Sequence, residues 1–165
     1  MTPTCQPRLS EIGDAAGGFR PFLESCWREW KARSARGTCP FETDSAGMCG
    51  FTSAFLAEAL ARKVGGEWRV AGGRPLSGGG VTCPKGLQNG HFWCVSDDGV
   101  IVDLTADQFG LPTVLVTTWR DGRYAETFTE REIVEHLPKV LPVAEAWLES
   151  AIEEGLVPGG MKLAA

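Results

Sequence analysis

Four segments with the composition of β-strands follow one another between residues 91 and 128. They cover residues 91–96, 100–105, 113–119 and 123–128, and their valine, isoleucine, threonine and aromatic content is typical of strands. The connections between them are too short for the crossover of a dozen or more residues that parallel pairing needs. We therefore expect an antiparallel meander of about four strands.

Helical patterns lie on both sides of these strands. Apolar residues recur at steps of three and four over residues 21–33, where Pro21 suits a first helical position, and again over residues 49–64. Residues 129–154 are expected to be helical: they begin with the spacing of a capping box, and the helix continues after Pro142. The first twenty residues show little periodicity and are expected to form an arm or a short helix. The expected fold class is α+β, with helices packed on the antiparallel sheet.

Composition indicates one globular domain. The chain has 165 residues, of which 43% are hydrophobic, and a net charge of −5; this argues against disorder and against nucleic-acid binding. No apolar run is long enough for a membrane span and the start does not resemble a signal peptide, so we expect a cytoplasmic protein without a membrane partner. Residues 1–160 are taken as the domain, and residues 161–165 resemble a vector-derived tail.

The six cysteines are expected to be free thiols, because no export signal accompanies them. No two of them form a C-x-x-C pair and the chain has only two histidines, so we expect no metal site and no cofactor. Cys49 is the one cysteine at the expected start of a helix, where unpaired N–H groups and the helix dipole favour a thiolate. Gly47 and Gly50 on either side would let a substrate approach its sulfur.

The segment between the second helix and the meander is rich in glycine. Residues 68–71 are expected to form a short strand, and residues 72–90, with seven glycines and two prolines, a mobile loop. This loop ends beside His91 and is a candidate lid over a site.

The turn between the first two strands of the meander decides which side chains share a face. A three-residue loop at residues 97–99, with Gly99 in the left-handed position, pairs Ser96 with Val100. That register places His91 and Asp103 as diagonal neighbours on one face. A two-residue loop at residues 98–99 would instead turn Asp103 to the opposite face.

With the three-residue loop, the chain supplies the nucleophile, base and orienting carboxylate of acyl transfer in Cys49, His91 and Asp103. The order of these residues resembles the transglutaminase-like branch of the papain-like superfamily, in which a cysteine begins a core helix and His and Asp follow on adjacent antiparallel strands. His91-Phe92-Trp93 is similar to its H-x-W strand and Asp103-Leu104-Thr105 to its D-x-T strand. The resemblance implies a papain-like core and a thiol-dependent enzyme acting on a protein, peptide or small amide, as a peptidase, deamidase or transglutaminase.

Other residues are candidates for binding the substrate. Gln108 follows the Asp103 strand and is expected to face the substrate, and Trp93 shares the face of His91 and is a candidate wall of the cleft. The Cys49 N–H is the natural first oxyanion donor, and Gln88, Asn89 or the Trp30 indole are candidates for the second.

Three other functions are compatible with the sequence. A protein that keeps the fold with an inert thiol would be a peptide- or protein-binding module. An effector would use the same acyl chemistry on a glutamine of another protein. A thiol-redox protein would need a disulfide between Cys49 and Cys83 or Cys94.

Overall fold

The computed structural model describes residues 9–34 and 42–160. Within them the chain forms three α-helices, seven strands and two 3₁₀ turns. Cys5, Cys39 and the expected tail at residues 161–165 lie outside the described residues.

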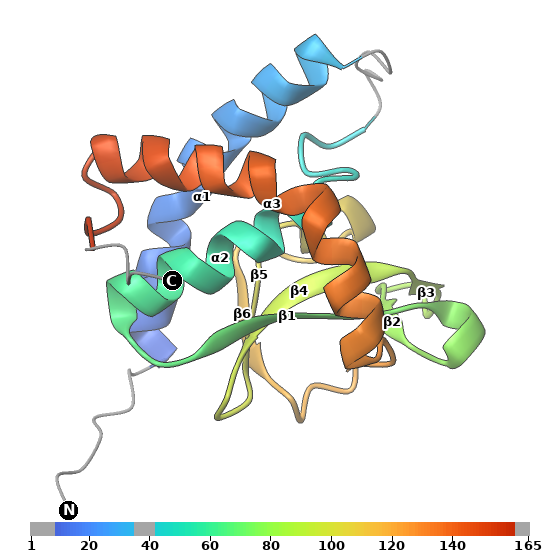
Figure 1. Cartoon of the computed structure of the whole chain (residues 1–165). Coiled ribbons are helices and arrows are strands. Elements are labelled where there is room, and N and C mark those ends of the chain that lie inside the picture. The colour runs from blue at the N-terminus through green and yellow to red at the C-terminus, as the bar shows by residue number, and fades with distance from the viewer. Residues whose placement is uncertain (1–8, 35–41, 161–165) are drawn as a thin grey trace, which may run out of the picture.

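A four-stranded antiparallel sheet forms the centre of the fold, in the order β1-β4-β5-β6. Its strands are β1 (Trp68–Gly73), β4 (His91–Ser96), β5 (Val100–Asp103) and β6 (Leu115–Thr118). The helices α2 (Cys49–Val64) and α3 (Glu130–Glu153) lie together over this sheet (Figure 1). The expected α+β class with helices on a four-stranded antiparallel sheet is confirmed.

A second, smaller sheet holds β3 (Gln88–Asn89), β2 (Gly80–Thr82) and β7 (Tyr124–Ala125), in that order. The expectation that residues 123–128 continue the meander is therefore wrong, since β1 is the fourth strand of the main sheet. A turn redirects the chain after β6: the N–H of Tyr124 donates to the Asp121 carbonyl at 3.1 Å, and the Asp121 carboxylate accepts from the Arg123 backbone and side chain.

The glycine-rich segment carries regular structure, contrary to the loop expected at residues 72–90. It contains the end of β1, the 3₁₀ turn η1 (Pro75–Ser77) and the strands β2 and β3. Its glycines permit close backbone approach rather than mobility. A Cβ on Gly80 would lie 2.0 Å from the Asn89 carbonyl oxygen, and a Cβ on Gly73 would lie 2.4 Å from the Gly80 nitrogen.

We expect Gly80→Ala to lower the free energy of unfolding by about 2 kcal/mol or more, because the new methyl meets backbone and the residue has a positive φ of +99°. Gly78→Ala is the matched control, since Gly78 has a φ of +73° but no atom within 4 Å of its Cβ position. It should cost about 1 kcal/mol from backbone strain alone. Urea unfolding of both variants measures the difference, and equal losses would contradict the packing explanation.

The first helix is longer than expected. α1 (Leu9–Arg33) begins well before Pro21, which lies inside the helix and not at its start. The reason is an apolar stripe whose periodicity is weak in the sequence because glycines interrupt it. Ile12, Ala16 and Phe19 are buried at helical spacing and extend the apolar face that residues 21–33 form.

The last helix continues through Pro142, as the sequence predicts. α3 contains both Pro138 and Pro142, and Figure 1 shows it changing direction midway along its length, as prolines inside a helix cause. Its predicted capping box is confirmed: the Glu132 N–H donates to Thr129 Oγ1, and the Thr129 N–H donates to the Glu132 carboxylate.

The central sheet is buried on both faces. Val70, Cys94 and Val102 pack against the helices, and Trp93 and Ile101 pack against the second sheet and its connections. His91 has the same parity on β4 as Trp93, so its ring lies on the side of the second sheet. Burial on both faces explains why apolar residues occupy successive positions, and not alternate ones, in the middle of β4 (92–95) and in β5 (100–102).

Candidate active site

Cys49 is the first residue of α2, as the sequence predicts. The Thr52 N–H makes the first helical bond, to the Met48 carbonyl at 3.0 Å, so the N–H groups of Cys49, Gly50 and Phe51 precede the helical ladder. These unpaired N–H groups lie at the end of α2 that carries the half-buried Cys49.

The helix α3 approaches this end of α2 through Gly50. A Cβ on Gly50 would lie 2.9 Å from His136 Nε2 and 3.3 Å from Val140. The His136 ring is stacked on Phe92, with 4.0 Å between ring centroids, and burial, with the charge of Lys139, lowers its pKa. Gly50 therefore serves helix packing, whereas the sequence suggested substrate access.

The hairpin between β4 and β5 has the register of the three-residue loop. Cys94 pairs with Val102 and Val95 with Ile101. The Gly99 N–H donates to the Ser96 carbonyl at 2.9 Å, and Gly99 has a φ of +86°. This prediction is confirmed.

The register brings His91 and Asp103 into direct contact. His91 Nε2 lies 2.7 Å from Asp103 Oδ2, and the two side chains are 0% and 1% exposed. Asp103 Oδ2 also accepts from the Tyr124 hydroxyl at 2.8 Å. The other oxygen, Oδ1, accepts from the Thr105 N–H at 2.9 Å and from its hydroxyl at 3.2 Å. Four donors thus hold the carboxylate in one orientation.

These contacts oppose the effect of burial on both ionisable groups. Burial alone would lower the pKa of His91, but the charge and hydrogen bond of Asp103, together with Cys49, raise it to about 10. Burial alone would raise the pKa of Asp103, but His91, Thr105 and Tyr124 hold it below its usual value. The pair is therefore an imidazolium and a carboxylate at neutral pH.

The second ring nitrogen of His91 is available to Cys49. Among the residues that the structure describes, His91 Nδ1 has no hydrogen-bond partner that meets the usual geometry. The Cys49 thiol nevertheless lies close enough to act on the ring through hydrogen bonding and charge, and it contributes to the raised pKa of His91. The structure thus brings the three predicted residues together, with His91 between Asp103 and Cys49.

Gln108 lies beside the loop that precedes Cys49. Its Oε1 accepts from the Gly47 N–H at 3.3 Å, and its Nε2 donates to the Thr105 carbonyl at 2.9 Å. Gln108 therefore joins the Cys49 loop to the residues that follow Asp103. Its contact with a substrate remains a prediction.

The other predicted binding residues are spread more widely. Trp93 is buried, with its ring 6.2 Å from that of His91 and 5.1 Å from that of Tyr124, measured between centroids. Gln88 and Asn89 form β3, where their side chains donate to the Gly78 and Leu87 carbonyls. The Trp30 ring packs on Phe51 of α2. Their roles toward a substrate or oxyanion remain predictions.

Three residues that support the site were missed in the sequence. Tyr124 binds Asp103 as described above, and Phe109, in the turn η2 (Ala106–Phe109), covers the edge of the His91 ring at 5.0 Å. Arg20 of α1 binds both oxygens of Asp107 and the Leu104 and Thr113 carbonyls. In the sequence, the only indication of this role was the position of Arg20 within the apolar stripe of α1, because a cation that is buried there needs hydrogen-bond partners.

The remaining described cysteines occupy different surroundings. Cys26, Cys49, Cys83 and Cys94 are all free thiols. Cys94 is fully buried, which raises the pKa of its thiol, and burial raises that of Cys26 to about 11. A hydrogen bond from the Leu87 backbone lowers the pKa of the Cys83 thiol. Of these four thiols, Cys49 is the one that interacts with His91.

Comparisons of the chain with protein-family models, curated proteins and solved structures found no match. Within residues 9–34 and 42–160, no group of three His, Cys, Asp or Glu side chains is arranged to hold a metal ion. None of the described helices is both long enough and apolar enough to cross a membrane.

Proposed function

We propose that this protein is a thiol-dependent acyl-transfer enzyme that acts on an amide bond or a glutamine side chain through Cys49, His91 and Asp103. One observation carries the proposal: His91 bonds to the Asp103 carboxylate and also interacts with a thiol at a helix N-terminus. A buried histidine with only a structural role would not need both partners. The transglutaminase-like resemblance of the sequence points to the same chemistry.

The first half of the reaction forms an acyl-enzyme. In the reactive form the proton of the Cys49 thiol already lies on His91 Nδ1, while Nε2–H donates to Asp103, which fixes the ring and holds it as an imidazolium. The thiolate attacks the carbonyl carbon of the amide. The negative charge that develops on the carbonyl oxygen is stabilised by the Cys49 N–H at the start of α2. The imidazolium then protonates the leaving amine as the C–N bond breaks.

The second half regenerates the thiol. His91 accepts a proton from water or an incoming amine, which attacks the thioester carbon, and the proton returns to the sulfur as the C–S bond breaks. Water gives a peptidase or a deamidase, and an amine gives a transglutaminase. Phe109 and the enclosed His91 ring keep bulk water from the dyad, which strengthens its electrostatic interactions.

The first test is the pH dependence of iodoacetamide labelling at Cys49, followed by mass spectrometry. We expect Cys49 to react rapidly at pH 6–7, and His91→Ala to slow it by at least about tenfold there, because the neutral thiol is then favoured. His136→Gln is the matched control and should leave the rate within about twofold, since the His136 ring stacks on Phe92 and burial lowers its pKa, which disfavours its charged form.

Equal and slow labelling of Cys49 in wild type and His91→Ala would overturn the enzyme proposal and favour the inert binding module. If labelling depends on His91, glutamine-containing peptides identify the reaction. A gain of one mass unit indicates deamidation, an adduct with an added primary amine indicates transamidation, and backbone cleavage indicates a peptidase.

A further inference from the structure

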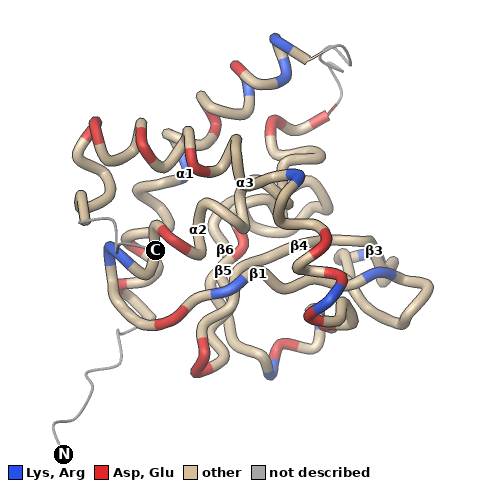
Figure 2. Tube along the Cα trace, viewed as in Figure 1, with Lys and Arg blue, Asp and Glu red and all other residues tan. Residues whose placement is uncertain are grey.

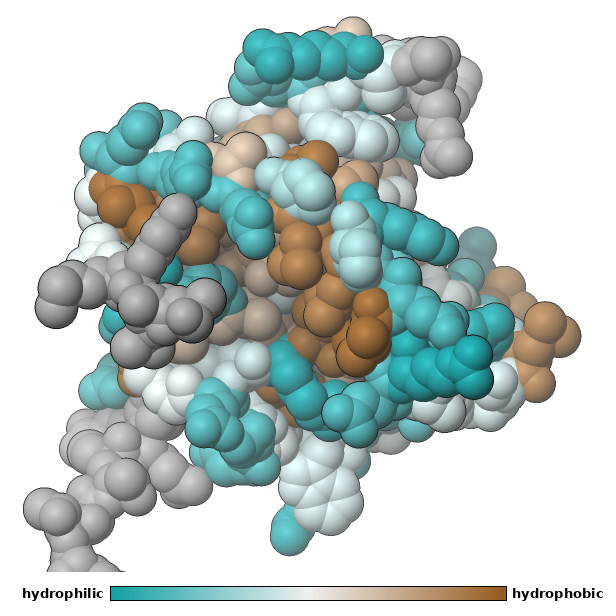
Figure 3. All heavy atoms as spheres, in the orientation of Figure 1, coloured by the Kyte–Doolittle hydropathy of each residue, from teal (hydrophilic) through white to brown (hydrophobic). Residues whose placement is uncertain are grey.

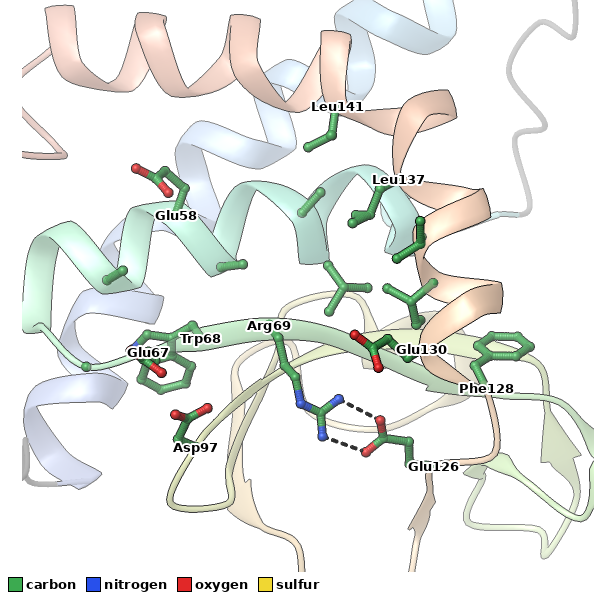
Figure 4. A pocket seen from close by; sticks show the side chains of 17 residues that line it. Glu58, Glu67, Trp68, Arg69, Asp97, Glu126, Phe128, Glu130, Leu137 and Leu141 are labelled. Atoms are coloured by element: carbon green, nitrogen blue, oxygen red, sulfur yellow. Dashed lines mark hydrogen bonds and ion pairs between the residues drawn. The ribbon is translucent and has the colours of Figure 1, made fainter. Parts of the chain in front are cut away.

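A wide apolar cavity lies away from the proposed triad. It has a volume of about 950 Å³ and is bounded by α2, β1 and the first half of α3 (Figure 4). Cys49, His91 and Asp103 are not among its lining residues. We call this cavity the α2–α3 groove.

The shape of the groove follows from helical spacing on its two walls. Ala54, Ala57 and Ala61 of α2 form a floor of small side chains, and Ile133 and Leu137 of α3 form an apolar wall. The bend in α3 carries its first half away from α2 and toward β1 (Figure 1). The groove therefore lies where two helices diverge, and a third helix can pack in such a space.

The apolar surface of the groove faces solvent. Val134 is 60% exposed, and Figure 3 shows apolar surface in the middle of this face with hydrophilic residues around it. An apolar patch with a polar rim is typical of a protein-binding surface. The end of the edge strand β1 is already occupied, because the Gly72 carbonyl accepts from the Thr127 and Phe128 N–H groups at 3.0 Å each; this argues for a helical occupant rather than an extended one.

Charge on the rim specifies the partner further. The lining includes five carboxylates, of Glu58, Glu67, Asp97, Glu126 and Glu130, and one cation, that of Arg69. Arg69 is already neutralised by a two-bond ion pair with Glu126 (Figure 4). Figure 2 shows acidic positions along α3, with basic ones among them, and a single basic position on β1. Glu67 and Asp97 face each other, and this contact raises the pKa of Glu67. Arg62 likewise pairs with Glu58 at 2.7 Å, so the carboxylates of Glu67, Asp97 and Glu130 remain in excess, and this net negative rim favours a positively charged partner.

We propose that the α2–α3 groove binds an amphipathic helix of a partner protein, with apolar side chains in the groove and lysine or arginine at its acidic rim. The lining runs along α2 from Ala54 to Ala61, about 11 Å or two turns at the rise of a helix, and continues past the end of α2 to Gly66, so it has room for at least two turns of a partner helix. This surface is independent of the proposed catalytic site.

The test uses a synthetic fluorescent peptide of fourteen residues with leucine at helical positions i, i+3, i+4 and i+7 and lysine elsewhere on its polar face. Fluorescence anisotropy with the full chain measures its affinity. We expect at least about tenfold tighter binding than for a peptide with glutamate in place of each lysine, and than for a scrambled peptide of the same composition. Equal binding of the three peptides would overturn the proposal.

Two pairs of variants locate the binding. Val134→Lys should weaken it at least about tenfold, and Leu76→Lys, at a position 97% exposed outside the groove, should leave it unchanged. Glu67→Gln with Asp97→Asn should weaken it more than Asp14→Asn with Glu42→Gln, which removes the same charge elsewhere. Binding that Val134→Lys does not alter would overturn the proposal. So would self-association in sedimentation that Val134→Lys abolishes, because the occupant would then be a second copy of this chain.

Discussion

Asp103→Ala is expected to lower the free energy of unfolding by about 3–5 kcal/mol, because it removes one partner of a buried pair. The change leaves His91, the Tyr124 hydroxyl and the Thr105 N–H without the carboxylate that accepts from all of them. Each unpaired buried donor adds a desolvation cost. Urea unfolding followed by tryptophan fluorescence measures the loss.

The same pair gives the stability of the protein a defined pH dependence. Because its pKa in the folded state is about 10, against 6.5 for an ordinary histidine, His91 contributes stability that is complete below pH 6.5 and is lost as the pH rises through about 10. Between those values the free energy of unfolding should fall by up to about 1.4 kcal/mol per pH unit. The lowered pKa of Asp103 has the opposite consequence: its contribution is present above its usual pKa and is lost in acid.

Asp103→Asn separates charge from shape. The amide retains an oxygen that accepts from Tyr124 or Thr105, but it removes the charge that raises the pKa of His91. The free energy of unfolding of Asp103→Asn should therefore depend much less on pH than that of the wild type between pH 7 and 8.5. Ordinary cysteines begin to titrate near the top of this window, but they add the same slope in both proteins, so the comparison of wild type with Asp103→Asn isolates His91. An equally steep dependence in wild type and Asp103→Asn would show that His91 is not the group responsible.

Arg20→Met is expected to cost about 3 kcal/mol or more of stability, because it leaves a carboxylate and two backbone carbonyls without their buried donor. The Arg20 side chain is 9% exposed and that of Asp107 is 13% exposed. Burial alone would lower the pKa of Arg20, but its bonds to Asp107 and Glu24 raise it, so the cation persists. The bonds of Arg20 to the Leu104 and Thr113 carbonyls fix α1 against the chain that leaves β5.

Arg28→Met is the matched control for this prediction. Arg28 lies on the same helix and binds Asp44 at 2.8 Å, but its side chain is 61% exposed. Its loss should change stability by about 0.5 kcal/mol or less, as for other surface ion pairs. Similar losses for Arg20→Met and Arg28→Met would contradict a buried anchoring role. The double variant Arg20→Met with Asp107→Leu should recover part of the loss, because it removes the unpaired carboxylate.

The sequence by itself determined the elements that depend on local signals. The start of α2 at Cys49, the capping box at Thr129 and the three-residue turn ending at Gly99 each depend on residues within one or two turns of chain. Since strand parity follows from the turn, the contact between His91 and Asp103 was also predictable. The nucleophile, base and orienting residue of the proposed site were therefore all named from sequence.

Only the tertiary structure decided the features that depend on distant backbone. Gly80 approaches Asn89 closely enough for the expected loop to form a second sheet. Tyr124 pairs with β2 in that sheet and not with the meander, and its hydroxyl binds Asp103. Arg20 finds its partners 84 to 93 residues away in sequence. No local pattern encodes such contacts, because their free energy depends on groups that become neighbours only when the sheet and helices have packed.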